Sequence, residues 1–151
     1  MFARLHILPA KGAPVAAILR RKPSKCVHVL RWHTLTGEVT SGSWFRGQIY
    51  PLRSDLSFDG EWLTYLALGS SGTTWNGLCH LPWLKTVAEA PNNGTWYGGG
   101  YWTSPEELRL NGWSPETPVP LPFRITTYSA PYGEDEGVLY PRLERDGWRR
   151  V

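Results

Sequence analysis

Two cysteines, each close to a histidine, are the most chemically distinctive residues of this chain. Cys26 with His28 and Cys79 with His80 together form a ligand set that Zn²⁺ accepts in proteins. Cys79 and His80 are adjacent, however, so on a strand their side chains point to opposite faces and cannot reach the same ion. The short Cys–Cys spacing of zinc fingers is also missing. We therefore predict no metal and no cofactor, and we expect both cysteines to be reduced and largely buried.

No motif of a known catalytic mechanism occurs in the sequence. The G-x-S-x-G motif of a nucleophilic serine is missing, and GSSGTTW at 69–75 indicates a polar turn. Cys26 and His28 share one face of a predicted strand, which is common for structural residues. The GGG at 98–100 lacks the Lys-Ser/Thr and the helix of a phosphate-binding loop. The sequence therefore favours a non-catalytic protein over an enzyme whose site its motifs do not reveal.

Aromatic side chains are better candidates for a binding surface. The candidates gather in two short segments: Trp44, Phe45, Trp96, Tyr97, Tyr101 and Trp102. Most of them must fill the core, because a chain of this size has few other large side chains. Any that remain exposed suit a protein interface or the stacking of nucleic-acid bases.

Basic residues form a second candidate group near the N-terminus, namely Arg20, Arg21, Lys22 and Lys25. Alternation along residues 15–22 should bury Val15 and one or both of Ile18 and Leu19. We expect the basic residues to form an exposed ridge at a strand end, with a turn at Pro23-Ser24. Arg20 and Arg21 should then point to opposite faces.

The basic group is part of a wider charge asymmetry. The first acidic residue is Glu38; the residues before it carry a charge of +7, and the rest of the chain carries −4. A basic segment of this kind can attract an anionic partner. It can also protect an exposed edge strand from pairing with another chain, and we favour this second interpretation.

The composition predicts an all-β protein. Nine tryptophans and seven tyrosines suit half-buried strands, and sixteen glycines with thirteen prolines interrupt almost every helical window. No segment approaches the ~20 apolar residues that would span a membrane. Pro9, Lys11, Gly12 and Pro14 break the apolar stretch that a signal peptide would need. We therefore expect a cytoplasmic protein that makes no membrane contact.

Short runs of strand-like residues follow one another along the chain. Residues 13–21 and 25–33 each form one such run, and 55–68 is predicted as a hairpin with its turn at Asp59-Gly60. GSWFRGQIY at 42–50 returns as GTWYGGGYW at 94–102, so Trp44 and Trp96 should occupy equivalent places in two similar β units.

The organisation predicted from this repeat is one domain of blade-like antiparallel β units. The units cover about 25–68 and 77–113, followed by a proline-rich crossover at 114–123 and a C-terminal strand pair at 124–151. Closed propellers have about four to eight blades, more than this chain can supply. The expected architecture is therefore an open or incomplete propeller-like stack, or one protomer of a homo-oligomeric ring.

SFDGEWLTYLA at 57–67 resembles the strand–turn–strand core of TolB-type and WD-type propeller blades. The chain also resembles a family of small, functionally uncharacterised bacterial proteins through ARLHILPAKGAPVAAILRRKPSK, HVLRW, DLSFDGEWLTYLAL and GGG followed by LRLN. This resemblance covers most of residues 3–113. It implies a repeated, propeller-like β architecture and no particular activity.

These features together favour a protein that binds another macromolecule, and we expect its partner to be a protein. An antitoxin-like or immunity-like role belongs to this class by analogy alone. The alternative is a nucleic-acid-binding module that uses the basic N-terminal third and exposed aromatic side chains. An enzyme with an unrecognised site is the third hypothesis.

Overall fold

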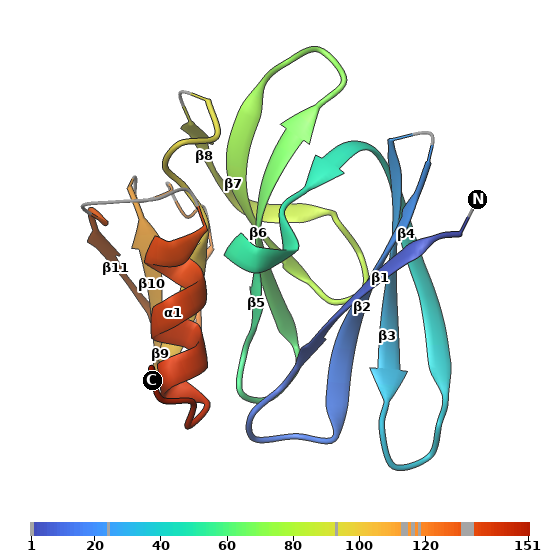
Figure 1. Cartoon of the computed structure of the whole chain (residues 1–151), viewed down its shortest axis with the longest axis horizontal. Coiled ribbons are helices and arrows are strands. Elements are labelled where there is room, and N and C mark those ends of the chain that lie inside the picture. Colours follow the sequence, from blue (N-terminus) through green and yellow to red (C-terminus); the bar gives the residue numbers. More distant parts are fainter. Residues whose placement is uncertain are drawn as a thin grey trace.

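Antiparallel β-sheet makes up most of the molecule, as the composition predicted. The structure is a computed structural model that describes residues 2–23, 25–92, 94–112, 115, 117, 119–130 and 135–151. A large twisted sheet is built from the chain up to Asn92, and a smaller sheet with a helix is built from the remainder (Figure 1). None of the described helices has the length and apolar character needed to cross a bilayer.

The large sheet is a series of antiparallel strands that mostly pair with the next strand in sequence. Its strands are Arg4–Pro9 (β1), Val15–Lys22 (β2), Cys26–His33 (β3), Val39–Ile49 (β4), Asp55–Leu56 (β5), Trp62–Gly69 (β6), Thr74–His80 (β7) and Thr86–Asn92 (β8). They lie in the order β1-β2-β3-β4-β6-β7-β8, and β5 pairs with β6. The 3-10 turn η1 (Pro51–Arg53) leads from β4 to β5.

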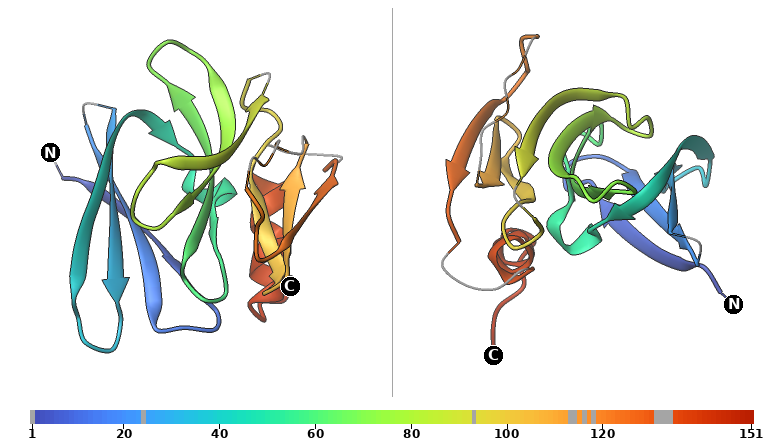
Figure 2. Two further views of the ribbon diagram at one scale, coloured as in Figure 1. Left: turned by 180° about the vertical axis from the view of Figure 1, so that it is seen from behind. Right: turned by 90° about the horizontal axis from the view of Figure 1, so that it is seen from above.

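The smaller sheet contains Gly100–Ser104 (β9), Glu107–Asn111 (β10) and Arg124–Tyr128 (β11), in the order β11-β10-β9. β9 and β10 are antiparallel, whereas β10 and β11 are parallel and therefore need a crossover connection. The crossover predicted at 114–123 lies in this connection, although residues 114, 116 and 118 are outside the described part. The helix α1 (Glu136–Arg145) lies across one face of the smaller sheet (Figure 2).

Two clusters of apolar side chains form the core. The first lies on one face of the large sheet and includes Val15 and Leu19 of β2, which confirms their predicted burial, and Val27 and Val29 of β3. The second lies between the two sheets. It joins Trp62, Leu78 and Ala88 of the large sheet to Trp102, Leu108, Leu110 and Phe123. The smaller sheet is therefore packed on the large one through an apolar interface.

The hairpin predicted at Asp59-Gly60 is confirmed. Gly60 has a φ of 76°, which favours glycine, and its N–H donates to the Ser57 carbonyl oxygen. The Asp59 carboxylate accepts hydrogen bonds from the Ser57 hydroxyl at 2.6 Å and the Glu61 N–H at 3.0 Å. These contacts connect β5 to β6, which pair through Asp55 opposite Thr64 and Leu56 opposite Leu63.

The predicted repeat does not produce two equivalent units. Residues 42–49 lie within the long strand β4, whereas residues 94–97 form bends, and β9 begins only at Gly100. Trp44 is thus on a strand and Trp96 in a connection. Similar residues take different conformations because their neighbours in space differ. Within the described residues, β1 and β8 end the strand order, so the large sheet is a single open series and not a ring of blades.

The C-terminal strand pair predicted at 124–151 is wrong beyond β11, because α1 occupies Glu136–Arg145. Pro141 lies inside this helix and cannot donate to the Gly137 carbonyl one turn earlier. The Tyr128 hydroxyl, reaching from β11, donates a hydrogen bond of 2.5 Å to that oxygen instead. Gly147 has a φ of 96° and follows the end of the helix.

Candidate functional site

The candidate site is the face of β1–β4 that points away from the apolar core. Residues that pair across antiparallel strands share one face, and Val15, Leu19, Val27 and Val29 belong to the core face. The residues between them therefore form an opposite face, which we call the outer face. Its members are Leu5, Ile7, Ile18, Arg20, Lys22, Cys26, His28, Leu30, Trp32, Val39, Ser41, Trp44 and Arg46.

Large apolar side chains lie exposed on the outer face. Leu5 is 58% exposed, Ile7 50%, Val39 51% and Trp44 52%. Ile18, Leu30 and Trp32 lie half-buried in the rows between them. Isolated exposed apolar residues are normal on a protein surface, but a contiguous apolar face commonly marks an interaction site.

A β-bulge in β4 places both Ser41 and Trp44 on the outer face. His28 is opposite Trp44, but Leu30 is opposite Ser41, so β4 contains one extra residue in this interval. Residues three apart on a regular strand face opposite sides, and the extra residue allows Ser41 and Trp44 to share the outer face. Gly42 is required here because a Cβ atom would lie 2.1 Å from the Pro82 carbonyl oxygen.

His28 and Trp44 form a stacked ring pair on the outer face. Their rings are stacked with centroids 3.9 Å apart and an interplanar angle of 8°. Nε2 of His28 lies 2.8 Å from the Ser41 hydroxyl, and the Lys22 ammonium lies 4.8 Å from the Trp44 ring centroid. Burial lowers the pKa of His28, and the positive charges of Arg20 and Lys22 lower it further. The neutral form of His28 is therefore favoured relative to that of an exposed histidine.

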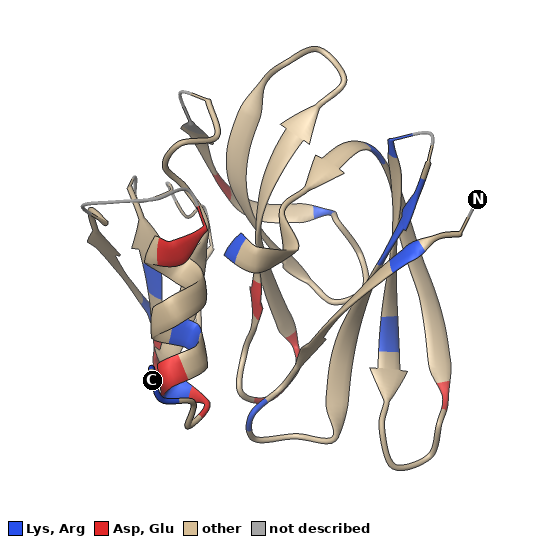
Figure 3. Ribbon diagram, in the orientation of Figure 1, with Lys and Arg blue, Asp and Glu red and all other residues tan. Residues whose placement is uncertain are grey.

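Positive charge gathers at one end of the four strands, as the blue segments at the upper right of Figure 3 show. We call this the basic end; its members are Arg4, Arg20, Arg21, Lys22, Lys25 and Arg46. All are exposed except Lys22, which is half-buried. Glu38, the only acidic residue before Asp55, precedes β4 at the opposite end of the strands. Within the described residues, no acidic side chain forms an ion pair with any member of the basic end.

The residues predicted as a basic ridge lie within this end. Arg20 and Arg21 point to opposite faces, because Arg20 pairs with Leu5 and His28, whereas Arg21 pairs with Arg4 and Val27. Lys25 directly precedes β3. The turn was predicted at Pro23-Ser24, and Ser24 lies outside the described residues.

The predicted aromatic set does not form one surface. Trp44 alone belongs to the outer face. Phe45 points to the core, where its ring meets Trp75 edge-on at 5.7 Å. Tyr101 and Trp102 are buried in β9. Trp96 and Tyr97 are exposed in the connection before β9, outside the strands that form the outer face.

The residues considered as zinc ligands are also dispersed. Cys79 is buried in the core, as predicted, but Cys26 is only half-buried on the outer face, and both are free thiols. The ring of His80 packs against Trp62 at 3.9 Å. No group of three or more His, Cys, Asp or Glu side chains placed to hold a metal ion occurs in the described part of the chain.

A second group of charged residues lies buried between the large sheet and α1. The Asp55 carboxylate accepts hydrogen bonds from Arg145 Nη1 at 2.5 Å and from the Trp102 N–H at 2.9 Å. Arg142 donates to the carbonyl oxygens of Pro51 and Ser54. Burial raises the pKa of Asp55, and the charge of Arg145 opposes that shift. These groups are bonded to one another and to the backbone, so this cluster has the character of a structural joint and not of an open site.

The outer face also contains residues that the sequence did not single out as site residues, among them Leu5, Ile7, His28 and Arg46. Leu5 and Ile7 alternate with Arg4 and His6, which is a signal that one face of β1 is apolar. The sequence does not indicate which face the core covers. That assignment depends on the pairing of β1 with β2.

The chain was compared with protein families, curated proteins and solved structures. No protein-family model matches the chain, and neither a curated protein nor a solved structure matches it.

Proposed function

We propose that the protein is a non-catalytic binding module that holds another protein against the outer face of β1–β4. The observation that carries this proposal is the exposure of Leu5, Ile7, Val39 and Trp44 on one continuous sheet face. Burying these apolar side chains against a partner would contribute about 25 cal/mol per Å² of apolar surface removed from water.

The basic end supports a partner with an acidic surface. Arg20, Lys22 and Arg46 lie on the outer face beside its apolar residues, and they complement a segment or patch that carries Asp and Glu next to apolar residues. The exposed charges would increase the association rate, and the apolar face would slow dissociation. The partner is therefore described by its chemistry as an acidic protein with an apolar contact area.

Site-specific crosslinking tests this proposal. A photoreactive amino acid is placed at position 7, on the outer face, and separately at position 148, where Trp148 is exposed beyond α1. A partner of the outer face should crosslink from position 7 and not from position 148. Ile7→Lys should then weaken binding of that purified partner by about tenfold, the effect of losing an interface anchor. Trp148→Lys is the matched control and should leave binding unchanged.

A partner that crosslinks equally from both positions would contradict the proposal. Unchanged affinity of the Ile7→Lys variant would contradict it as well. Circular dichroism and unfolding of both variants establish that a loss of binding does not come from a loss of fold.

Single-stranded nucleic acid is the second candidate ligand, and the six cations of the basic end with Trp44 favour it. One face of the Trp44 ring is already stacked on His28, however, and the exposed aliphatic side chains have no role in binding phosphates. A salt titration with a single-stranded oligonucleotide separates the two functions. Nucleic-acid binding through several phosphates would give a steep decrease of log K with log salt concentration.

A further inference from the structure

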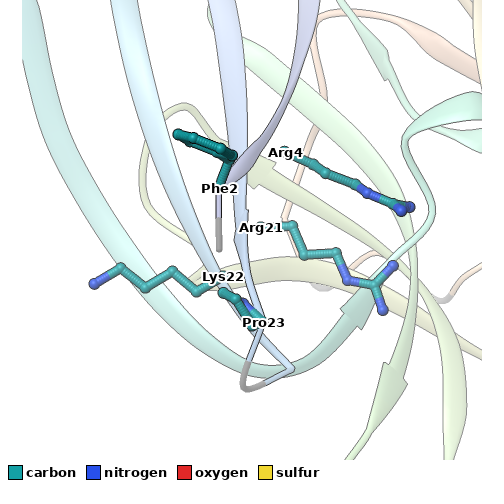
Figure 4. Close-up of a pocket in the computed structure, with 5 residues that line it drawn as sticks. All are labelled: Phe2, Arg4, Arg21, Lys22 and Pro23. Atoms are coloured by element: carbon teal, nitrogen blue, oxygen red, sulfur yellow. The ribbon is translucent and has the colours of Figure 1, made fainter.

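Arg4, at the start of β1, lies directly opposite Arg21, near the end of β2. Arg4 pairs with Arg21 in the antiparallel register, on the face opposite to Arg20. Figure 4 shows both side chains extending in the same direction, whereas Lys22 and Phe2 extend the other way. Side chains directly opposite each other on antiparallel strands are neighbours, so both guanidinium groups serve the same side of the two strands.

This placement is unfavourable for the isolated protein. Like charges directly opposite each other on neighbouring strands destabilise a sheet. Neither Arg4 nor Arg21 has an acidic partner among the described residues. Burial lowers the pKa of the neighbouring His6, and the charges of Arg4 and Arg21 lower it further, so His6 does not add a third positive charge. An anion between the two arginines would remove the repulsion.

A pocket with space for such an anion is present. It has a volume of about 330 Å³ and is lined by Phe2, Arg4, Arg21, Lys22 and Pro23 (Figure 4). This volume lies at the lower end of the range of small-molecule sites. Phe2 and Pro23 are the uncharged lining residues of the pocket, and the Phe2 ring points to the side opposite to the two guanidinium groups.

We propose that Arg4 and Arg21 form a binding site for the phosphate group of a small phosphate monoester. Each guanidinium presents a planar fork of N–H donors that fits two oxygens of a phosphate. Two forks can bind a tetrahedral dianion from two sides, whereas a carboxylate has only two oxygens and is satisfied by one fork.

This site is separate from the proposed protein interface, because Arg4 and Arg21 are on the other face from Ile7, Arg20 and Trp44. Loss of phosphate binding would therefore leave the proposed function untouched. The two proposals can fail independently.

Calorimetric titration of the full chain with inorganic phosphate and with phenyl phosphate tests the site. We expect saturable binding of both probes, because each carries the phosphate oxygens that the two guanidinium groups bind. Arg4→Gln and Arg21→Gln should each weaken binding by about tenfold or more, as expected for a lost charge-assisted hydrogen-bond pair. Arg20→Gln is the matched control, because it removes the same charge from the same strand on the opposite face. It should change affinity by less than about twofold, the change expected from screened long-range charge alone.

Two further measurements test the site independently of titration calorimetry. Phosphate should raise the melting temperature of the wild-type protein and of Arg20→Gln, but not that of Arg4→Gln or Arg21→Gln. Phosphate should also raise the pKa of His6, measured from its ring signals by NMR, because the bound anion offsets the charges of Arg4 and Arg21.

If Arg20→Gln weakens phosphate binding as much as Arg21→Gln does, the proposal is overturned. Phosphate would then be attracted by the charge of the whole basic end and not by a site at Arg4 and Arg21. Absence of saturation by either probe would overturn it too, and would leave protection of the sheet edge as the role of the two arginines. A single-stranded oligonucleotide that binds through Arg4 and Arg21 when phenyl phosphate does not would show that the phosphate belongs to a polymer, which also contradicts a small-molecule site.

Discussion

The indole of Trp44 lies flat on the imidazole of His28, with ring centroids 3.9 Å apart and planes within 8°. The two residues are direct partners across β3 and β4, and the bulge at residues 42–43 lets Ser41 bond to the same imidazole. Trp44 is half-exposed, whereas His28 beneath it is buried. The outer face therefore contains an exposed aromatic side chain whose position is fixed by stacking on a buried, hydrogen-bonded ring.

The buried position of His28 predicts a pH dependence of stability. Burial, with Arg20 and Lys22, lowers its pKa from 6.5, and burial, with Arg4 and Arg21, does the same for His6. The unfolded chain then binds protons more readily than the folded chain. The stabilising contribution of both residues is complete above pH 6.5 and decreases as the pH falls through their lowered pKa values.

Urea unfolding at several pH values measures this effect. The free energy of unfolding should fall between pH 6.5 and roughly pH 5, above the range where most Asp and Glu titrate. A His6→Gln, His28→Gln double variant should show a flatter dependence in this interval. An unchanged slope would show that neither histidine is responsible.

The buried ion pair between Asp55 and Arg145 predicts a large loss of stability when one partner is removed. The two side chains are 2% and 8% exposed, so Arg145→Met leaves a carboxylate buried without its main partner. The free energy of unfolding should decrease by about 3–5 kcal/mol. Arg150→Met, which breaks the exposed pair with Glu144, is the control and should cost less than about 1 kcal/mol. Similar losses in the two variants would contradict a structural role for the buried pair.

The two thiols should differ in reactivity. Burial raises the pKa of Cys79 to about 12, so almost no thiolate exists at neutral pH. Cys26 lies half-buried on the outer face. A chromogenic disulfide reagent should therefore modify one thiol in the folded protein and both in urea. The Cys26→Ser variant should show no fast reaction; a fast reaction in that variant would mean that the core around Cys79 opens.

The strands β2 and β3 and the hairpin of β5 and β6 could be predicted because their signals are local. Alternation in residues 15–22 and 26–33 and the Asp59-Gly60 turn each depend on a few neighbouring residues. The helix could not, because its stability depends on contacts from elsewhere in the chain. Pro141 argues against a helix, and the Tyr128 hydroxyl on β11 satisfies the carbonyl group that Pro141 leaves free.

The candidate site could be predicted only where it too depends on local sequence signals. The basic residues of β2 follow a strand that is clear from the sequence, so their exposure at its end could be expected. The aromatic residues could not be sorted into core and surface, because Trp44 and Trp102 lie in similar local sequences. Trp102 is buried only because the large sheet and Phe123 surround it, and these contacts are distant in sequence. Asp55 is likewise distinguished from other acidic residues by Arg145 and the Trp102 N–H, and both partners are distant from it in sequence.

The assignment of faces on β1 yields the last prediction, in which adjacent residues should respond in opposite ways. Ile7 points outward and is half-exposed, whereas Leu8 belongs to the core cluster. Ile7→Thr keeps a β-branched side chain and should change the free energy of unfolding by no more than about 0.5 kcal/mol. Leu8→Ala should cost about 2–5 kcal/mol, because it leaves a cavity in the core. Urea unfolding of the two variants measures both values. A one-residue shift of β1 against β2 would exchange the two effects, so a costly Ile7→Thr with a harmless Leu8→Ala would contradict the register and the outer face built on it. The expected result would show that Ile7 does not serve the stability of the isolated chain, which is consistent with a role of Ile7 in contact with a partner.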